Sequence, residues 1–555
     1  MKRKTIKIIC LTLVLTLVLT GCGISGGDKT TDSKLDVNVP VKPNTQSNDS
    51  YQGGGVMFDG GLSVSGGVNG YMDWSGTEFN TSEYNDVKES GFLSTKTSPL
   101  STFAADVDTA SYTNLRAILM DKASEYPYYQ SESLHDVRIE EMLNYFDYNF
   151  KGETKGDFTV STEISETPWN SETQLLVINV KAKELPKAEH SGSNLVFLID
   201  VSGSMDSEDK LPLLKESLSL LVEELTEKDT ISIVTYSGSE RVVLEGASGA
   251  DKNTILSALN ELEAYGSTNG ESGLKKAYEI AKKYQDDHSN TRVIMCSDGD
   301  LNVGMTSVDD LLDFVEKKRE TGIYLSVLGF GLGNYKDNKM ETLADNGNGN
   351  YHYIDCVDEG KKVLVDDLMS TLVTLADDVK FQIEFNPKFI KGYRKIGYEN
   401  RNLADEDFED DTKDGGEIGY GHEVTIVYEI VPADSSFNIN DSDLKYQETV
   451  ASSNSNEWCT ISIRYKPHGK LLSLLKSTLL EFVVDETSYT TTPSDDWKFI
   501  SNVVGFGLIV NESKYKEDLT LNDVIESLNK LELTDEYKKE FLSLTKKYNI
   551  ATKIS

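Results

Sequence analysis

A carboxylate and two hydroxyl groups stand at alternate positions where an apolar run ends near the middle of the chain. The segment NLVFLIDVSGSMDSEDK covers residues 194–210, and its apolar run stops at Asp200, followed by Ser202 and Ser204. Carboxylate and hydroxyl oxygens are ligands of hard divalent cations, and hydroxyls coordinate without adding negative charge. This spacing therefore indicates a candidate cation site.

Two further oxygen-bearing side chains could reach the same site. Thr268 lies in the loop YGSTNGES, and Asp298 follows the apolar run of VIMCSDGD. Small hard cations prefer an octahedron of oxygens, and the absence of His and Cys from the set disfavours zinc. The five residues are therefore candidate ligands of Mg2+ or Mn2+.

The elements that must position these residues alternate between strand and helix from Asn194 to about Leu375. Leucines at 211, 214, 218, 221 and 225 predict one helix. Other helices are expected at residues 253–264, 271–284, 308–320, near 340 and at 361–375, and strands at 195–199, 230–236, 241–244, 292–297, 323–330 and 351–355. The short turn SGSE predicts that the second and third strands pair antiparallel. The fold class is α/β, a doubly wound, mostly parallel sheet with one antiparallel edge, in which ligands bind beyond the carboxyl ends of strands.

These motifs resemble the metal-ion-dependent adhesion site of the von Willebrand factor A domain. The D-x-S-x-S of residues 200–204, the Thr of GSTN and the Asp of SDG all match the family's pattern. The resemblance implies that Ser202, Ser204 and Thr268 contact Mg2+ directly, while Asp200 and Asp298 often act through water. It also implies that an acidic group of a partner completes the coordination shell.

The flanking segments resemble a narrower bacterial family of A-domain lipoproteins. The resemblance rests on LSTFAADVDTASYTNLRAIL and VRIEEMLNYFDYNF before the A domain, and on YRKIGYENRNLADEDFEDD and GEIGYGHEVTIVYEIVP after it. It covers most of the chain beyond the N-terminal tether and implies dedicated N- and C-terminal domains.

The N-terminus reads as an export signal, with four basic residues before an apolar run from Ile8 to Leu19 that is too short to span a bilayer. The sequence Leu19-Thr20-Gly21-Cys22 resembles the lipobox of bacterial lipoproteins, which implies lipidation of Cys22. We therefore expect a lipid-anchored protein of the cell membrane that faces outside the cytoplasm.

Composition limits the partners and the disulfides. A formal net charge of -37 argues against nucleic acid and against electrostatic docking on anionic lipid, so the lipid anchor is the expected membrane contact. With Cys22 lipidated, Cys296, Cys356 and Cys459 allow at most one disulfide. The strand order of the A-domain family implies that Cys296 and Cys356 are separated by a strand and do not pair.

The expected domain organisation has seven parts. They are a signal peptide (1–21), a Gly/Ser-rich tether (22–91), a mostly helical N-terminal domain (92–152), a β segment (153–192), the A domain (193–377), a β-rich C-terminal domain (378–494) and a helical C-terminal segment (495–555). Because an isolated hairpin is marginal in water, we expect the two β-rich parts to form one domain into which the A domain is inserted. A separate β layer on each side is the alternative.

Two acidic motifs are interpreted as structural. DVDTAS, beginning at Asp106, lacks the strong preceding apolar strand of a phosphoryl-transfer motif and predicts a turn and helix cap. The acidic segment from Asp405 to Glu417 carries carboxylates suited to Ca2+, but it lacks the Gly at the sixth position of an EF-hand loop. A solvated acidic loop is favoured.

The expected function is the binding of a protein or other acidic ligand through the divalent cation, without catalysis. A metal-stabilised structural or sensory component of the envelope is one alternative. A metal-dependent hydrolase is a weaker one, because the sequence shows no acid-base His or Lys motif near the site.

Overall fold

The central domain is built on a six-stranded sheet with the order β11-β10-β9-β6-β7-β8. This computed structural model describes residues 88–121, 137–267, 270–286, 290–299, 308–331, 337–439, 456–468 and 476–554. The strands are β6 (Ser193–Asp200), β7 (Thr230–Tyr236), β8 (Glu240–Ser248), β9 (Asn290–Ser297), β10 (Tyr324–Phe330) and β11 (Tyr351–Ile354). All neighbours are parallel except β7 and β8. The predicted doubly wound sheet with one antiparallel edge is confirmed.

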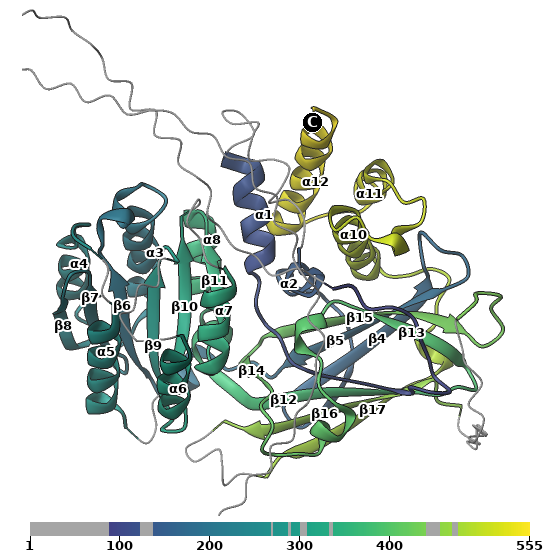
Figure 1. The fold of residues 1–555 in the computed structure, drawn as a ribbon, viewed down its shortest axis with the longest axis horizontal. Helices are drawn as coiled ribbons and strands as arrows, with labels where there is room; N and C mark the ends of the chain where they lie inside the picture. Colours follow the sequence, from purple (N-terminus) through teal and green to yellow (C-terminus); the bar gives the residue numbers. More distant parts are fainter. Residues whose placement is uncertain are drawn as a thin grey trace, which may run out of the picture. The chain divides into compact units, whose positions relative to one another are not determined.

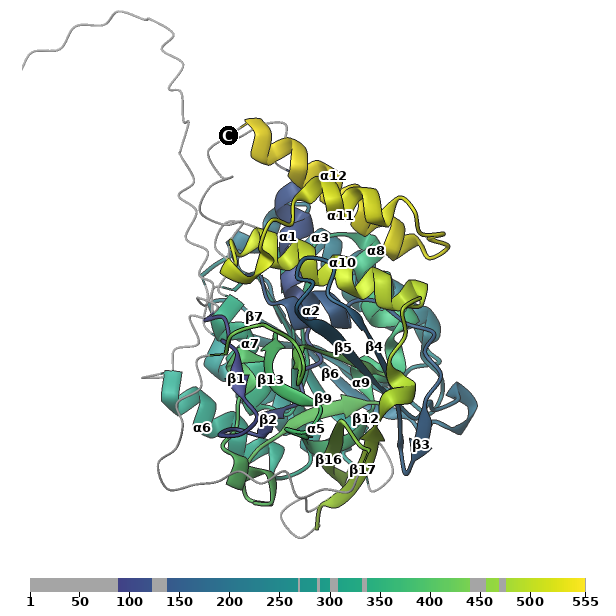
Figure 2. The same cartoon turned by 90° about the vertical axis from the view of Figure 1, so that its right-hand side faces the viewer.

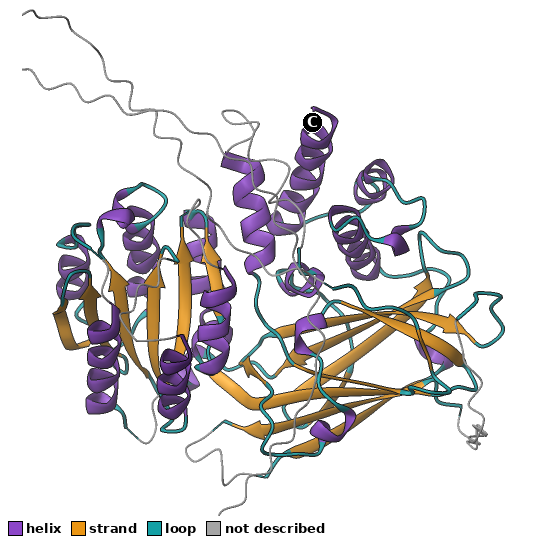
Figure 3. Cartoon of the chain, in the orientation of Figure 1, coloured by secondary structure: helices purple, strands orange, loops and turns teal. Residues whose placement is uncertain are grey.

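Helices cover both faces of this sheet, because its central strand is apolar on both sides (Figures 1 and 3). In β6, Phe197 packs in one buried cluster with α3 and α4, whereas Leu198 packs in another with α5, α6 and α7. The helices are α3 (Leu211–Glu224), α4 (Lys252–Asn260), α5 (Gly270–Tyr284), α6 (Val308–Arg319) and α7 (Asp337–Asn346). Because alternate side chains of β6 and β9 are buried on the two faces of the sheet, the ends of these strands are held in fixed positions.

Two further sheets form a β-sandwich that includes strands from before and after the central domain. The first sheet has the order β1-β13-β15-β5-β4-β3, and the second has the order β14-β12-β16-β17 with β2 on β12. Their bounds are β1 (Leu93–Ser94), β2 (Leu100–Ala104), β3 (Glu153–Lys155), β4 (Phe158–Glu166), β5 (Gln174–Ala182), β12 (Thr374–Phe385), β13 (Ile390–Ile396), β14 (Gly416–Gly419), β15 (Glu423–Pro432), β16 (Cys459–Pro467) and β17 (Thr478–Val484). Because β5 pairs with β15, the central domain is an insertion into the sandwich, as expected, and separate β layers are excluded.

The first sheet of the sandwich is also covered by helices on its other face. Leu175 and Val177 of β5 pack in one buried cluster with residues of five helices, whereas Leu176 and Ile178 face the second sheet. These helices are α1 (Ala110–Asp121), α2 (Ile139–Asn144), α10 (Asp495–Val510), α11 (Leu521–Leu528) and α12 (Glu536–Ile554). Figure 2 shows α10 and α12 above the strands. The N- and C-terminal helices therefore share one core.

One expectation about element type is wrong, and another is incomplete. The predicted helix at residues 361–375 is divided into α8 (Val357–Lys361), a π-helical turn (Lys362–Asp366) and α9 (Leu368–Leu372), and strand β12 begins at Thr374. A strand forms here in place of the predicted helix because its residues pair with β14 and β16 and bury their apolar side chains in the sandwich. The N-terminal part of the region predicted as mostly helical, residues 92–152, instead supplies β1 and β2, which pair with β13 and β12.

The described part of the chain contains no disulfide and no helix long and apolar enough to cross a bilayer. Cys296 is buried in β9, and β10 lies between β9 and β11, after which Cys356 follows. The predicted absence of a bond between Cys296 and Cys356 is confirmed. Cys22 and the predicted leader and tether, to residue 87, lie outside the described residues.

Candidate functional site

Two neighbouring parallel strands end at the candidate cation site. Ile199 of β6 lies opposite Cys296 of β9, so Asp200 and Asp298 follow this pair by one and two residues at the same edge of the sheet. Since β6 pairs with β7 on one side and β9 on the other, this edge is where the winding direction reverses. Four of the five predicted ligands, all except Thr268, are described here.

Asp200 is a buried carboxylate with one oxygen that makes no hydrogen bond of good geometry. Its Oδ1 accepts a hydrogen bond from the backbone N–H of Ser202 at 2.8 Å, whereas its Oδ2 makes no hydrogen bond of good geometry to a described residue, although the hydroxyl of Tyr236 interacts with this carboxylate. Burial raises the pKa of Asp200 to about 6 against the opposing effect of that N–H. A cation at Oδ2 would stabilise the ionised form of this side chain.

The two serines lie close together beside this carboxylate. The Oγ atoms of Ser202 and Ser204 are 3.1 Å apart. The backbone N–H of Gly203 donates to the carbonyl of Gly266 at 3.1 Å. This bond holds the loop between α4 and α5, which contains Gly266, against the D-x-S-x-S turn. Thr268 comes two residues after Gly266 and lies outside the described residues.

Lys210 is a component of this site that the sequence reasoning missed. Its Nζ donates to Asp298 Oδ2 at 2.9 Å and to the carbonyl of Ser204 at 2.9 Å, which shows directly that the two motifs meet. A Cβ at Gly331 would lie 2.3 Å from Cε of Lys210, so any larger residue at position 331 would displace the lysine side chain from its present position. The sequence feature that could have indicated it is the position of Lys210 immediately before helix α3, at the end of the segment of residues 194–210 that contains the D-x-S-x-S motif.

The donor set fits a hard divalent cation. It combines the buried Oδ2 of Asp200, the two serine hydroxyls and the carboxylate of Asp298, with no His or Cys among the described members. Such a set could hold Mg2+ or Mn2+ once the ammonium group of Lys210 moves away from Asp298 and the ion takes its place.

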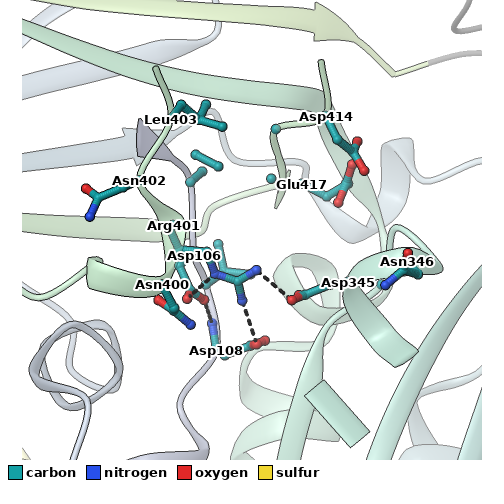
Figure 4. A pocket seen from close by; sticks show the side chains of 16 residues that line it. Asp106, Asp108, Asp345, Asn346, Asn400, Arg401, Asn402, Leu403, Asp414 and Glu417 are labelled. Carbon is teal, nitrogen blue, oxygen red and sulfur yellow. Dashed lines mark hydrogen bonds and ion pairs between the residues drawn. The ribbon is translucent and has the colours of Figure 1, made fainter. Parts of the chain in front are cut away.

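A second cluster of charges surrounds Arg401 at a cavity of about 220 Å³ (Figure 4). The guanidinium lies 2.7 Å from Asp106 Oδ2, 2.6 Å from Asp345 Oδ2 and 3.5 Å from Asp108 Oδ2. The backbone N–H of Asp108 donates to Asp106 Oδ1 at 3.0 Å, as the predicted turn requires. DVDTAS thus forms a turn, and its carboxylates belong to an ion-pair network that the sequence did not predict.

The acidic segment from Asp405 to Glu417 is only partly solvated. Asp405 and Glu406 are exposed, but Glu417 is buried in β14. The interpretation as a solvated loop is therefore wrong at its C-terminal end, because the pairing of β14 with β12 draws Glu417 into the protein.

Comparisons with known proteins agree with this organisation. A family model described as "von Willebrand factor type A domain" matches residues 194–366, one described as "von Willebrand factor" matches residues 78–177, and one described as "Uncharacterized protein YfbK, C-terminal" matches residues 370–550.

Among solved structures, the chain resembles a von Willebrand factor type A protein from Catenulispora acidiphila. The identity is 16%, the TM-score is 0.37, and the match covers 69% of this chain and 88% of that one. It also resembles proximal thread matrix protein 1 from the mussel byssus, in a structure described as having a zinc-occupied MIDAS motif. There the identity is 18%, the TM-score is 0.27, and the match covers 34% of this chain and 46% of that one.

Among curated proteins, "Uncharacterized protein YfbK" of Escherichia coli (strain K12) is 37% identical over 489 residues. The match covers 86% of this chain and 82% of that protein. Because this similarity extends through the central domain and both flanking regions, the chain belongs to the YfbK family, with a von Willebrand factor type A domain between dedicated N- and C-terminal regions.

Proposed function

We propose that this protein binds Mg2+ or Mn2+ at the edge of its central sheet and, through that ion, an acidic group of a protein partner. The observation that carries the proposal is the buried Oδ2 of Asp200, which makes no hydrogen bond of good geometry to a described residue and lies in a turn with two serine hydroxyls. The A-domain family provides the second support, because it commonly uses such a site for metal-dependent adhesion.

Each predicted ligand has a distinct role in this proposal. Ser202, Ser204 and Thr268 would contact the ion, and Asp200 and Asp298 would fix its position and balance its charge. Bound metal supplies an open coordination position for a carboxylate of the partner. Helix α3 and the loop that contains Gly266 hold the turn in place, so the site needs little rearrangement beyond a new position for Lys210.

The decisive experiment compares Asp200→Ala with Asp206→Ala, a matched change of an exposed carboxylate in the same motif. In the parent protein, Mg2+ or Mn2+ should raise the melting temperature. At a metal concentration 100 times the dissociation constant, binding should increase the free energy of unfolding by about 2.7 kcal/mol. The cation should also permit capture of partner proteins by crosslinking on intact cells. Asp200→Ala should abolish both effects, and Asp206→Ala should retain both.

The outcomes also separate the rival functions. Metal-dependent stability without metal-dependent capture would favour a structural or sensory envelope component. Metal-dependent turnover in a hydrolase screen would favour the enzyme. Absence of any effect of metal on melting or capture would refute the adhesion site.

We also propose that the protein is anchored to the cell membrane, facing outside the cytoplasm, through lipid on Cys22. The support is the sequence Leu19-Thr20-Gly21-Cys22 after a basic and apolar leader. The native protein should label with palmitate and sediment with membranes. A Cys22→Ala form that still labels and sediments would contradict the proposal.

A further inference from the structure

Three carboxylates converge near the junction between the central domain and the β-sandwich. Asp378 lies in β12 with a positive φ of 52°, Asp414 precedes β14, and Glu417 lies within β14. One carboxylate oxygen from each residue lies within 4.8 Å of the other two. Figure 4 shows the side chains of Asp414 and Glu417 directed toward one another at the wall of the cavity.

Glu417 is the member of this cluster whose charge is least compensated. The residue is 9% exposed, and its Oε1 makes no hydrogen bond to any described residue. Burial, followed by the neighbouring charges of Asp414, Asp377 and Asp378, holds its pKa well above the ordinary value for glutamate. A buried carboxylate in this environment must acquire either a proton or a cation.

Two of the protein's own cations pair with the other two carboxylates of the cluster, so a bound ion would share Asp378 and Asp414 with them. Lys466 Nζ lies 2.6 Å from Asp378 Oδ2, and Arg319 NH1 lies 2.5 Å from Asp414 Oδ2. Arg292, which is also buried nearby, donates to the hydroxyl groups of Ser326 and Thr374 through its terminal nitrogens, and its charge acts on Glu417 without a hydrogen bond between them. Asp377 accepts from Tyr324 at 2.7 Å and lies 2.9 Å from His468 Nδ1.

The geometry of the oxygens suits calcium. An ion with ligand distances of 2.3–2.6 Å can touch oxygens up to about 5 Å apart, and the three oxygens lie within 4.8 Å of one another. Three carboxylates from the protein suit Ca2+, whereas Mg2+ usually keeps several waters and takes only one or two carboxylates. The three carboxylates supply only oxygen, which disfavours zinc. Asp414 has a side chain that is 48% exposed, and the cavity that it lines with Glu417 gives an ion access from solvent.

We propose that Asp378, Asp414 and Glu417 bind a calcium ion that fastens the loop at residues 405–417 to the junction of the two domains. This site is independent of the adhesion site. Asp200 follows the carboxyl end of β6, whereas the calcium cluster neighbours Asp377, which bonds to Tyr324 at the amino end of β10. The two sites therefore lie at opposite ends of the parallel strands of the central sheet, one beyond their carboxyl ends and the other beside their amino ends.

The test measures calcium bound per chain by equilibrium dialysis of the full-length protein, with Mg2+ in excess to occupy the adhesion site. The parent and Asp200→Ala should each bind one Ca2+, and Glu417→Gln should bind none. Glu406→Gln, an exposed change in the same loop, should still bind one. Because Glu417→Gln removes an uncompensated buried charge, its melting temperature in chelator should equal or exceed that of the parent.

This last comparison distinguishes a ligand from a residue that merely supports the fold. A structural role alone would lower stability in Glu417→Gln both with and without calcium. The proposal is overturned if the parent binds no Ca2+ under these conditions, which would mean that Glu417 carries a proton instead. It is also overturned if Glu417→Gln retains the bound ion.

Discussion

Lys210 and a divalent cation compete for the same carboxylate. The lysine Nζ lies 2.9 Å from Asp298 Oδ2, and its stem passes over Gly331. Lys210→Met keeps much of the apolar stem and removes the ammonium group. We therefore expect Mg2+ to bind about tenfold more tightly, which corresponds to roughly 1.4 kcal/mol less repulsion at the site. Calorimetric titration of Mg2+ into parent and variant measures this change.

The same substitution should have the opposite effect when metal is removed. In chelator, Lys210→Met leaves Asp298 without its ammonium partner, so the variant should melt at a lower temperature than the parent. Lys215→Met, on the next turn of α3, is the matched control and should leave Mg2+ affinity unchanged. Equal or weaker Mg2+ binding by Lys210→Met would show that the two cations do not compete.

Asp200 should make stability depend on pH in a direction that metal reverses. Its pKa rises from 3.8 to about 6 on folding, so in chelator the ionised side chain costs the folded state about 3 kcal/mol above pH 6. The cost declines as the pH falls from 6 toward 4. Asp200→Asn should therefore be more stable than the parent at pH 7 in chelator, and the difference should disappear near pH 4.

Urea unfolding of both proteins at the two pH values measures this difference. In Mg2+ at pH 7 the order should invert, because only the parent binds the ion. A stability difference that does not change with pH would show that Asp200 is not the titrating group.

At the scale of elements, helix α5 must pack closely against β6 and β7. A Cβ at Gly273 would lie 2.8 Å from Cβ of Tyr236 and 3.1 Å from Cδ1 of Leu198. Gly273→Ala should therefore force the helix outward and lower the free energy of unfolding by about 1–2 kcal/mol, despite the higher helix propensity of alanine. Glu279→Ala, on the exposed face of the same helix, should change it by less than about 1 kcal/mol. Chemical denaturation tests both, and equal effects would contradict the close packing.

The sequence predicted those elements whose own residues carry the signal of burial. The alternation of strands and helices in the central domain was visible because β6 and its neighbours each carry an apolar run, and the D-x-S-x-S motif follows directly from the end of such a run. Residues near Thr374 satisfy a helical pattern equally well, and only pairing with the distant strands β14 and β16 decides for β12.

The charged residues were harder to predict because their partners are distant in sequence. Arg401 meets Asp106 across 295 positions, and nothing local marks either residue as buried. Glu417 was likewise interpreted as solvated with its acidic neighbours, although pairing of β14 buries it. Composition reports how many charges a segment has, whereas tertiary pairing decides which of them lose contact with water.

At the scale of the whole molecule, Arg401 joins three parts of the chain through one guanidinium group. Asp106 belongs to the N-terminal segment, Asp345 to α7 of the central domain, and Arg401 follows β13 of the sandwich. Arg401→Met would leave the buried carboxylate of Asp106 and the half-buried carboxylate of Asp345 without this counter-ion, so the free energy of unfolding should fall by about 3 kcal/mol. Because each domain keeps its own core, calorimetry should resolve two transitions in the variant where the parent shows one.

A surface ion pair provides the comparison that makes this result specific. Lys187 pairs with Glu224 at 2.5 Å, but its side chain is 58% exposed, so Lys187→Met should cost less than about 1 kcal/mol and leave a single transition. If Arg401→Met also unfolds in one transition with so small a loss, the domains must be held together by their apolar contacts. The separate melting of the central domain is therefore the measurement that decides whether the buried charges act as the fastening between domains.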